Sequence, residues 1–112
     1  MDTDQHPAAR LRARLDGLAG FSEKRMMGGH CFFLNGNMVG CAGRNKAGEG
    51  WFMLRVGKNN SARAEALHGG KPVMKGGQRM GGMYLVDQEQ SDAIIGAWVA
   101  LAVGNALCLP VK

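Results

Sequence analysis

Three cysteines and three histidines are the residues of this chain best suited to nucleophilic or metal chemistry. Zinc sites usually take two ligands from a short knuckle, such as two cysteines separated by two residues, and the chain has no such spacing. A cysteine nucleophile needs a nearby histidine and a positive environment. His6, His30 and His68 could each serve in principle, but no spacing selects one of them. We therefore expect no metal ion and no cofactor, and we expect all three cysteines to be reduced packing residues.

A second candidate for chemistry is the segment GRNKAGEG, residues 43–50, whose glycines are spaced as in a phosphate-binding loop. Glu49 stands where that loop carries its lysine, and Gly50 stands where it carries serine or threonine. A carboxylate there would repel the phosphates that the lysine should reach. The segment therefore predicts a loop between strands. Together with the cysteine analysis, this predicts a protein that is not an enzyme, and a cysteine-dependent enzyme stays an alternative.

Basic side chains are concentrated in residues 44–79, which hold eight basic and two acidic residues, while the whole chain carries a net charge of +5. Such a segment fits an acidic surface or a nucleic acid. No helix pairs basic recognition residues with a turn-helix partner, so the alternative to protein binding is weak, electrostatic nucleic-acid contact. The candidate binding residues are Arg44, Lys46, Arg55, Lys58, Lys71, Lys75 and Arg79.

The elements that must position these residues begin with a hairpin. Asn35-Gly36 separates two short apolar runs and supplies the two positive-φ residues of a type I′ turn. With a two-residue turn, Cys31 should lie opposite Gly40 and Cys41 opposite His30. The predicted strands cover residues 30–34, 37–42, 51–56, 71–75 and 82–86.

Helices are predicted at residues 8–18, 61–68 and 91–107 from apolar spacing and capping residues. The order is helix, three strands, helix, two strands, helix. Strands grouped on either side of a helix favour an α+β fold with a mostly antiparallel, five-stranded sheet. The length suits one domain, residues 1–112.

The predicted helix at 91–107 is apolar on every side, which is typical of a helix that is buried on every side. Its second partner is either the 8–18 helix of the same chain or the same helix of a second copy, which would make a homodimer. The apolar run at 93–104 is too short to span a membrane. The N-terminus has no secretory signal, so we expect a cytoplasmic protein without a membrane partner.

Several short motifs follow one another in a fixed order: Arg25-Met26-Met27-Gly28-Gly29, Asn35-Gly36, Phe52-Met53-Leu54-Arg55-Val56, Tyr84 and Trp98. Together they resemble the N-terminal domain of the TfoX/Sxy competence regulators over residues 8–107. Met27 replaces the family's usual phenylalanine. The resemblance implies a secretion-chaperone-like α+β fold without catalytic residues. It also implies a regulatory module with a transcription-related protein partner, since family members act alongside the cyclic-AMP receptor protein. Full-length members carry a second, C-terminal helical domain, so we expect a stand-alone N-terminal domain here.

Overall fold

The computed structural model describes residues 6–26 and 28–111. Its helices are α1 (Pro7–Leu15), α2 (Ser61–Glu65) and α3 (Asp92–Cys108), with a 3-10 turn η1 (Lys58–Asn60) before α2. Its strands are β1 (Phe21–Met26), β2 (Gly29–Leu34), β3 (Asn37–Arg44), β4 (Gly50–Arg55), β5 (Gly70–Lys75) and β6 (Gln78–Asp87). The predicted α+β class is confirmed.

The strands form one antiparallel sheet in the order β1-β2-β3-β4-β6-β5. The sheet has six strands, so the prediction of five was wrong by one. The missed strand is β1, an edge strand on which only Phe21 is partly buried and the other residues are exposed. A strand that buries so little shows no apolar alternation, which explains why its sequence does not reveal it.

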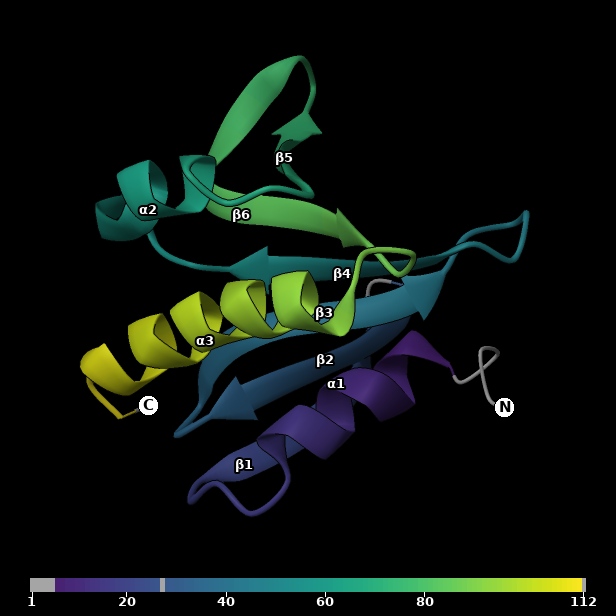
Figure 1. Ribbon diagram of the computed structural model, residues 1–112. Helices are drawn as coiled ribbons and strands as arrows, with labels where there is room; N and C mark the ends of the chain where they lie inside the picture. Colours follow the sequence, from purple (N-terminus) through teal and green to yellow (C-terminus); the bar gives the residue numbers. More distant parts are fainter. Residues whose placement is uncertain (1–5, 27, 112) are drawn as a thin grey trace.

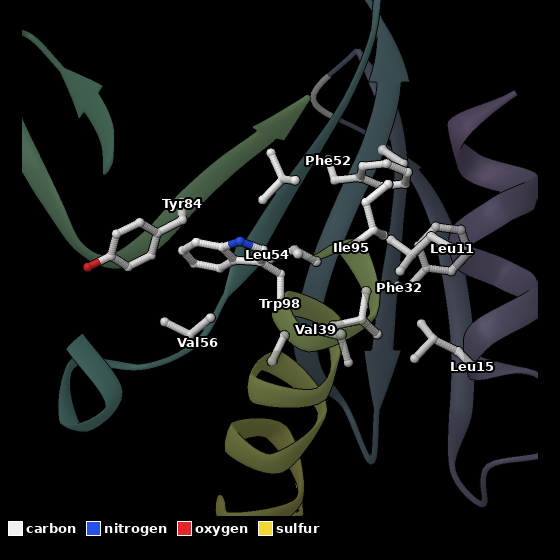
Figure 2. Packing of buried hydrophobic residues seen from close by; sticks show 14 of the residues in the cluster. Leu11, Leu15, Phe32, Val39, Phe52, Leu54, Val56, Tyr84, Ile95 and Trp98 are labelled. Atoms are coloured by element: carbon white, nitrogen blue, oxygen red, sulfur yellow. The ribbon is translucent and has the colours of Figure 1, made fainter. Parts of the chain in front are cut away.

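Both long helices lie on one face of the sheet, with α3 across β3 and β4 and α1 across β2 and β3 (Figure 1). A single hydrophobic core fills the space between the helices and the sheet, and Figure 2 shows Trp98 of α3 beside Tyr84 of β6 within it. The Trp98 indole N–H donates to the carbonyl of His68 at 2.9 Å, so this large side chain is buried with its polar atom satisfied. The core therefore holds the helix layer on one side of the sheet.

The hairpin predicted at Asn35-Gly36 is confirmed, because both residues have positive φ (54° and 81°) and connect antiparallel β2 and β3. The predicted register is wrong. Phe33 pairs with Met38, but Phe32 pairs with Gly40, so Val39 is an extra residue that bulges on β3. A bulge shifts the pairing of every residue beyond it by one position.

The helices are close to their predicted positions. A hydrogen bond from the Ile94 N–H to the Ser91 side chain caps α3, which begins at Asp92. The helix predicted at 8–18 ends earlier, because Asp16 is extended and Gly17 has a φ of 88°. Among the described residues, no helix is long and apolar enough to cross a membrane.

Candidate binding face

The sheet has a second face, opposite the helices, on which apolar side chains are only partly covered. Along β4, Phe52 and Leu54 are fully buried in the core, whereas the alternating residues Trp51 and Met53 are half-buried. Because successive strand residues point to opposite faces, these two lie on the far side of the sheet. The pairing places more residues there. We call the "open face" the set Met26, Phe33, Met38, Trp51, Met53, Met83 and Leu85.

An open face of this composition is unusual. The solvent side of an antiparallel sheet is normally polar, which gives the strands their alternation. Here four methionines, two aromatic residues and a leucine occupy it, beside the charged residues Arg55 and Asp87, which pair with Met83 and Trp51. The helices of residues 6–26 and 28–111 pack on the other side. Met26 is 40% exposed and the rest are half-buried.

One row of paired residues crosses all six strands of the open face. A lysine begins the row on edge strand β1, and another ends it on edge strand β5; between them the row is apolar. Its members are Lys24, Cys31, Cys41, Met53, Leu85 and Lys71. Both lysines are exposed. Along this row the open face is therefore apolar in its middle and positively charged at both edges, and Arg55, two residues after Met53 on β4, adds a positive charge to the same face.

Cys31 and Cys41 occupy the centre of that row and form a disulfide. The prediction that all three cysteines are reduced is wrong for these two, because the bulge at Val39 brings them directly opposite each other instead of one position apart. Both are fully buried, so their sulfur atoms form the floor of the open face. Cys108 is free and exposed near the end of α3.

Two glycines make room for the Trp51 ring on the open face. The Trp51 ring lies against Gly43 on β3 and Gly29 on β2. A Cβ built on Gly43 would approach the Trp51 ring to 2.8 Å, and one on Gly29 would approach it to 3.2 Å. These glycines leave the space in which the indole lies flat on the sheet. The sequence shows the glycines, but only strand pairing shows what they accommodate.

The seven basic residues predicted to bind do not form one patch. Arg44 and Lys46 lie at the end of β3 and in the loop that follows, whereas Arg55 and Lys58 line a pocket of about 260 Å³. The same pocket is lined by Asn105 of α3, whose side-chain amide donates to the Arg55 carbonyl at 3.5 Å.

The remaining three lie on the β5–β6 hairpin. Lys71 flanks the open face, and Lys75 is exposed near the hairpin turn. Arg79 donates to Glu65 of α2 at 2.5 Å and to the Tyr84 hydroxyl at 2.8 Å. That ion pair lowers the pKa of the Glu65 carboxyl, mainly through the hydrogen bond from Arg79. Arg79 thus joins α2 to β6. Lys24 was not among the predicted binding residues, but it flanks the open face at β1 as Lys71 does at β5.

Titratable groups meet between α1 and the first strands. Arg12 donates to both oxygens of Glu23, at 2.7 and 2.8 Å, and this hydrogen bonding is the main reason that the Glu23 pKa is lowered. The rings of His6 and His30 meet edge to face, with centroids 5.9 Å apart. Burial lowers the pKa of His6, and the positive charge of Arg44 adds to the shift. These contacts tie α1 to the sheet.

Neither Cys31 nor Cys41 carries a free thiol in this structure. Within residues 6–26 and 28–111, no group of three or more histidine, cysteine or acidic side chains converges as metal ligands would. The chemistry offered by the described residues is apolar contact and positive charge.

One family model, described as the TfoX N-terminal domain, matches residues 13–106. Neither the curated proteins nor the solved structures yield a match.

Proposed function

The chain belongs to the TfoX N-terminal domain family, and from this premise we propose that it is a non-enzymatic regulatory module that acts through protein contacts. The observation that carries the proposal is the open face. Contiguous apolar surface that helices leave uncovered is typical of interaction sites. The proposed partner is a transcription-related protein, and the proposed setting is the regulation of transcription, as in competence regulators.

The proposal is tested by affinity capture from native extract, with and without nuclease treatment, using three forms of the chain as bait. The first is the natural chain, the second is Met53→Glu at the centre of the open face, and the third is Leu107→Glu. Leu107 is 53% exposed on α3, in the helix layer, so its variant makes the same change away from the open face. A transcription-related protein recovered by the first and third baits, but not by the second, supports the proposal.

Two results would contradict it. Recovery that disappears on nuclease treatment would indicate that a nucleic acid, not a protein contact, retains the partner. A turnover assay with a product that vanishes in a Cys41→Ser variant would indicate an enzyme.

The second candidate function is weak nucleic-acid binding, and Arg55 and Lys58 in one pocket favour it. Binding through phosphate contacts weakens steeply with salt, with a slope of log K against log salt of about −0.9 per neutralised phosphate. Titration of duplex DNA between low and physiological salt measures this slope. An Arg55→Ala/Lys58→Ala variant should lower the slope by up to about two units if both side chains contact phosphates.

A cytoplasmic location is part of the proposal, and the Cys31–Cys41 disulfide makes it testable. Persistent disulfides are rare in the cytosol and are usually redox-responsive where they occur. Rapid alkylation of intact cells, followed by cell fractionation and mass analysis of the chain in each fraction, measures both the location of the chain and the oxidation state of its cysteines. A chain found outside the cytoplasmic fraction would overturn this part of the proposal.

A further inference from the structure

We propose that the open face docks an amphipathic helix of a partner protein, with carboxylates along both sides of the helix's apolar stripe. This inference rests on the proposed function and names the chemistry of the partner. It follows from the cross-strand row, in which Lys24 and Lys71 bracket the apolar middle of the sheet. The apolar stripe would contact the methionines, and the carboxylates would meet the two lysines.

The dimensions of the face fit one helix. Six adjacent strands are separated by five steps of about 4.8 Å, so the backbones of Lys24 and Lys71 lie about 24 Å apart. A lysine side chain reaches about 6 Å from its Cα, so two that lean inward leave about 12 Å, the width of one helix with its side chains. Lys24 already leans inward, because its Nζ lies 5.9 Å from the centre of the Phe33 ring on the neighbouring strand.

The side chains in the middle of the open face favour an amphipathic helix as the partner. Met26, Met38, Met53 and Met83 all belong to the open face. Methionine side chains are flexible and polarizable, so they adapt to the shape of an inserted apolar stripe. Strand β4 has six residues, about 20 Å, which corresponds to about 14 residues of helix laid along it.

A second copy of this chain fits less well. The chain carries a net charge of +5, and its two long helices do not supply carboxylates along both sides of an apolar stripe. The α1 sequence PAARLRARL has none, and α3 has Asp92 in its first turn as its only acidic residue. Two open faces brought together would also place lysines against an already basic molecule, which costs free energy in a low-dielectric contact.

A single-stranded nucleic acid also fits less well. Its bases would need aromatic side chains at the spacing of successive nucleotides. Phe33 and Trp51 lie on either side of the cysteine row and two strands apart, which places them about 16 Å from each other. The Cys31–Cys41 disulfide occupies the sheet between them.

The experiment uses the full chain and three synthetic helical peptides of about 16 residues that share one leucine stripe, a length that covers β4. They differ only in the positions beside the stripe, which are all glutamate, all lysine or all glutamine. Dissociation constants come from fluorescence anisotropy. We expect the glutamate peptide to bind at least about tenfold more tightly than the lysine peptide, because electrostatic complementarity selects between them.

Four variants locate the contact. Lys24→Glu/Lys71→Glu should reverse the order of the glutamate and lysine peptides. The matched control, Lys46→Glu/Arg63→Glu, makes the same change in net charge at two exposed residues away from the open face and should preserve the order. Met53→Glu should weaken the glutamate peptide by about tenfold or more, through like charge and lost apolar contact, whereas Leu107→Glu should not. Circular dichroism of each variant verifies folding before binding is measured.

Three results would overturn the inference. The first is equal affinity for the glutamate and lysine peptides, or no binding of the glutamate peptide at millimolar concentration. The second is self-association of the natural chain that Met53→Glu abolishes and Leu107→Glu does not, which would make a second copy the occupant. The third is displacement of the glutamate peptide by a single-stranded oligonucleotide at a lower concentration than by unlabelled peptide.

The peptide experiment and the capture experiment can fail independently, so a wrong helix-docking inference is distinguishable from a wrong proposed function. If the glutamate peptide does not bind more tightly than the lysine peptide, but Met53→Glu still abolishes capture of a transcription-related protein, the open face binds a partner of other chemistry. If Met53→Glu leaves that capture unchanged while the peptides discriminate as expected, the face binds acidic helices but the proposed partner uses another surface.

Discussion

Cys31 and Cys41 lie directly opposite each other on β2 and β3, with Cα atoms 4.0 Å apart, and a disulfide joins them beneath the open face. The pairing depends on the Val39 bulge, because a regular hairpin from Asn35-Gly36 would put Gly40 opposite Cys31. The disulfide therefore depends on the β-bulge in β3, and it lies at the base of the surface that we propose to bind a partner.

The first prediction concerns the thiols. In the chain unfolded in denaturant without reductant, we expect one titratable thiol, at Cys108, and none in a Cys108→Ser variant. Replacing both bonded cysteines by alanine should lower the free energy of unfolding by about 2–3 kcal/mol, because the unfolded chain regains the freedom of a short loop. Urea denaturation measures the loss. Three thiols titrated in the unfolded, unreduced chain would show that the disulfide does not form in solution.

The second prediction tests the packing of the Trp51 ring against Gly43 with two glycine substitutions. Gly43→Ala should destabilise the fold by about 1–3 kcal/mol, because its Cβ would overlap the indole and force the ring outward. Gly104→Ala is the control: a Cβ there meets nothing within 4 Å, and alanine favours the helix, so stability should rise by about 0.5–1 kcal/mol. Both values come from denaturant unfolding. A Gly43→Ala variant as stable as Gly104→Ala would show that Trp51 is not held as described.

The third prediction concerns pH. The Ala8 N–H donates to Nδ1 of His6 at 3.0 Å, which caps α1 only while that nitrogen is unprotonated. Burial, followed by the charge of Arg44, lowers the His6 pKa in the folded chain below 6.5. The unfolded chain then binds more protons, so the stabilising contribution is complete above pH 6.5 and is lost as the pH falls through the folded pKa.

The control for that prediction is His6→Asn, which keeps a capping acceptor but does not titrate near neutral pH. Thermal unfolding followed between pH 7.5 and 5 should show the natural chain losing stability relative to the variant. The Glu23 carboxyl does not confuse this comparison, because its pKa lies below 4.5 and its contribution is lost only at lower pH. Parallel curves for the two proteins would contradict a titrating cap at His6.

The fourth prediction is self-association through α3. The 8–18 segment of the same chain already covers part of this helix, since Arg14 donates to the Asp92 carbonyl at 3.0 Å and lies against Gly96. Ala100 and Gly104 on α3 remain exposed, so a dimer through this side stays a prediction. Sedimentation velocity at high micromolar concentration should show a dimer that Ala100→Glu converts to monomer. A natural chain that sediments as a monomer throughout would leave α1 as the only helical neighbour of α3.

The amino-acid sequence by itself determined the α+β class, the Asn35-Gly36 hairpin, the final helix and the family. These depend on local features: a turn that needs two positive φ angles, apolar periodicity, a capping serine, and motifs in a fixed order. It also located β2, β3, β4 and β6, because each of these buries enough residues to show in the pattern. Strand β5 has no fully buried residue and was located between the glycine pairs 69–70 and 76–77.

Tertiary structure alone decided the sixth strand, the cysteine pairing and the open face. β1 belongs to the sheet through backbone hydrogen bonds at an edge, which any side chains permit. The disulfide depends on one extra residue in β3, and no local pattern marks Val39 as that residue. The seven basic residues are near one another in sequence, but the strand order separates them and brings Lys24 and Lys71 to opposite edges of one face. A binding surface on a sheet is made of residues from several strands, so its composition depends on strand register and strand order. Local sequence patterns do not reveal either of these, because both depend on contacts between distant segments.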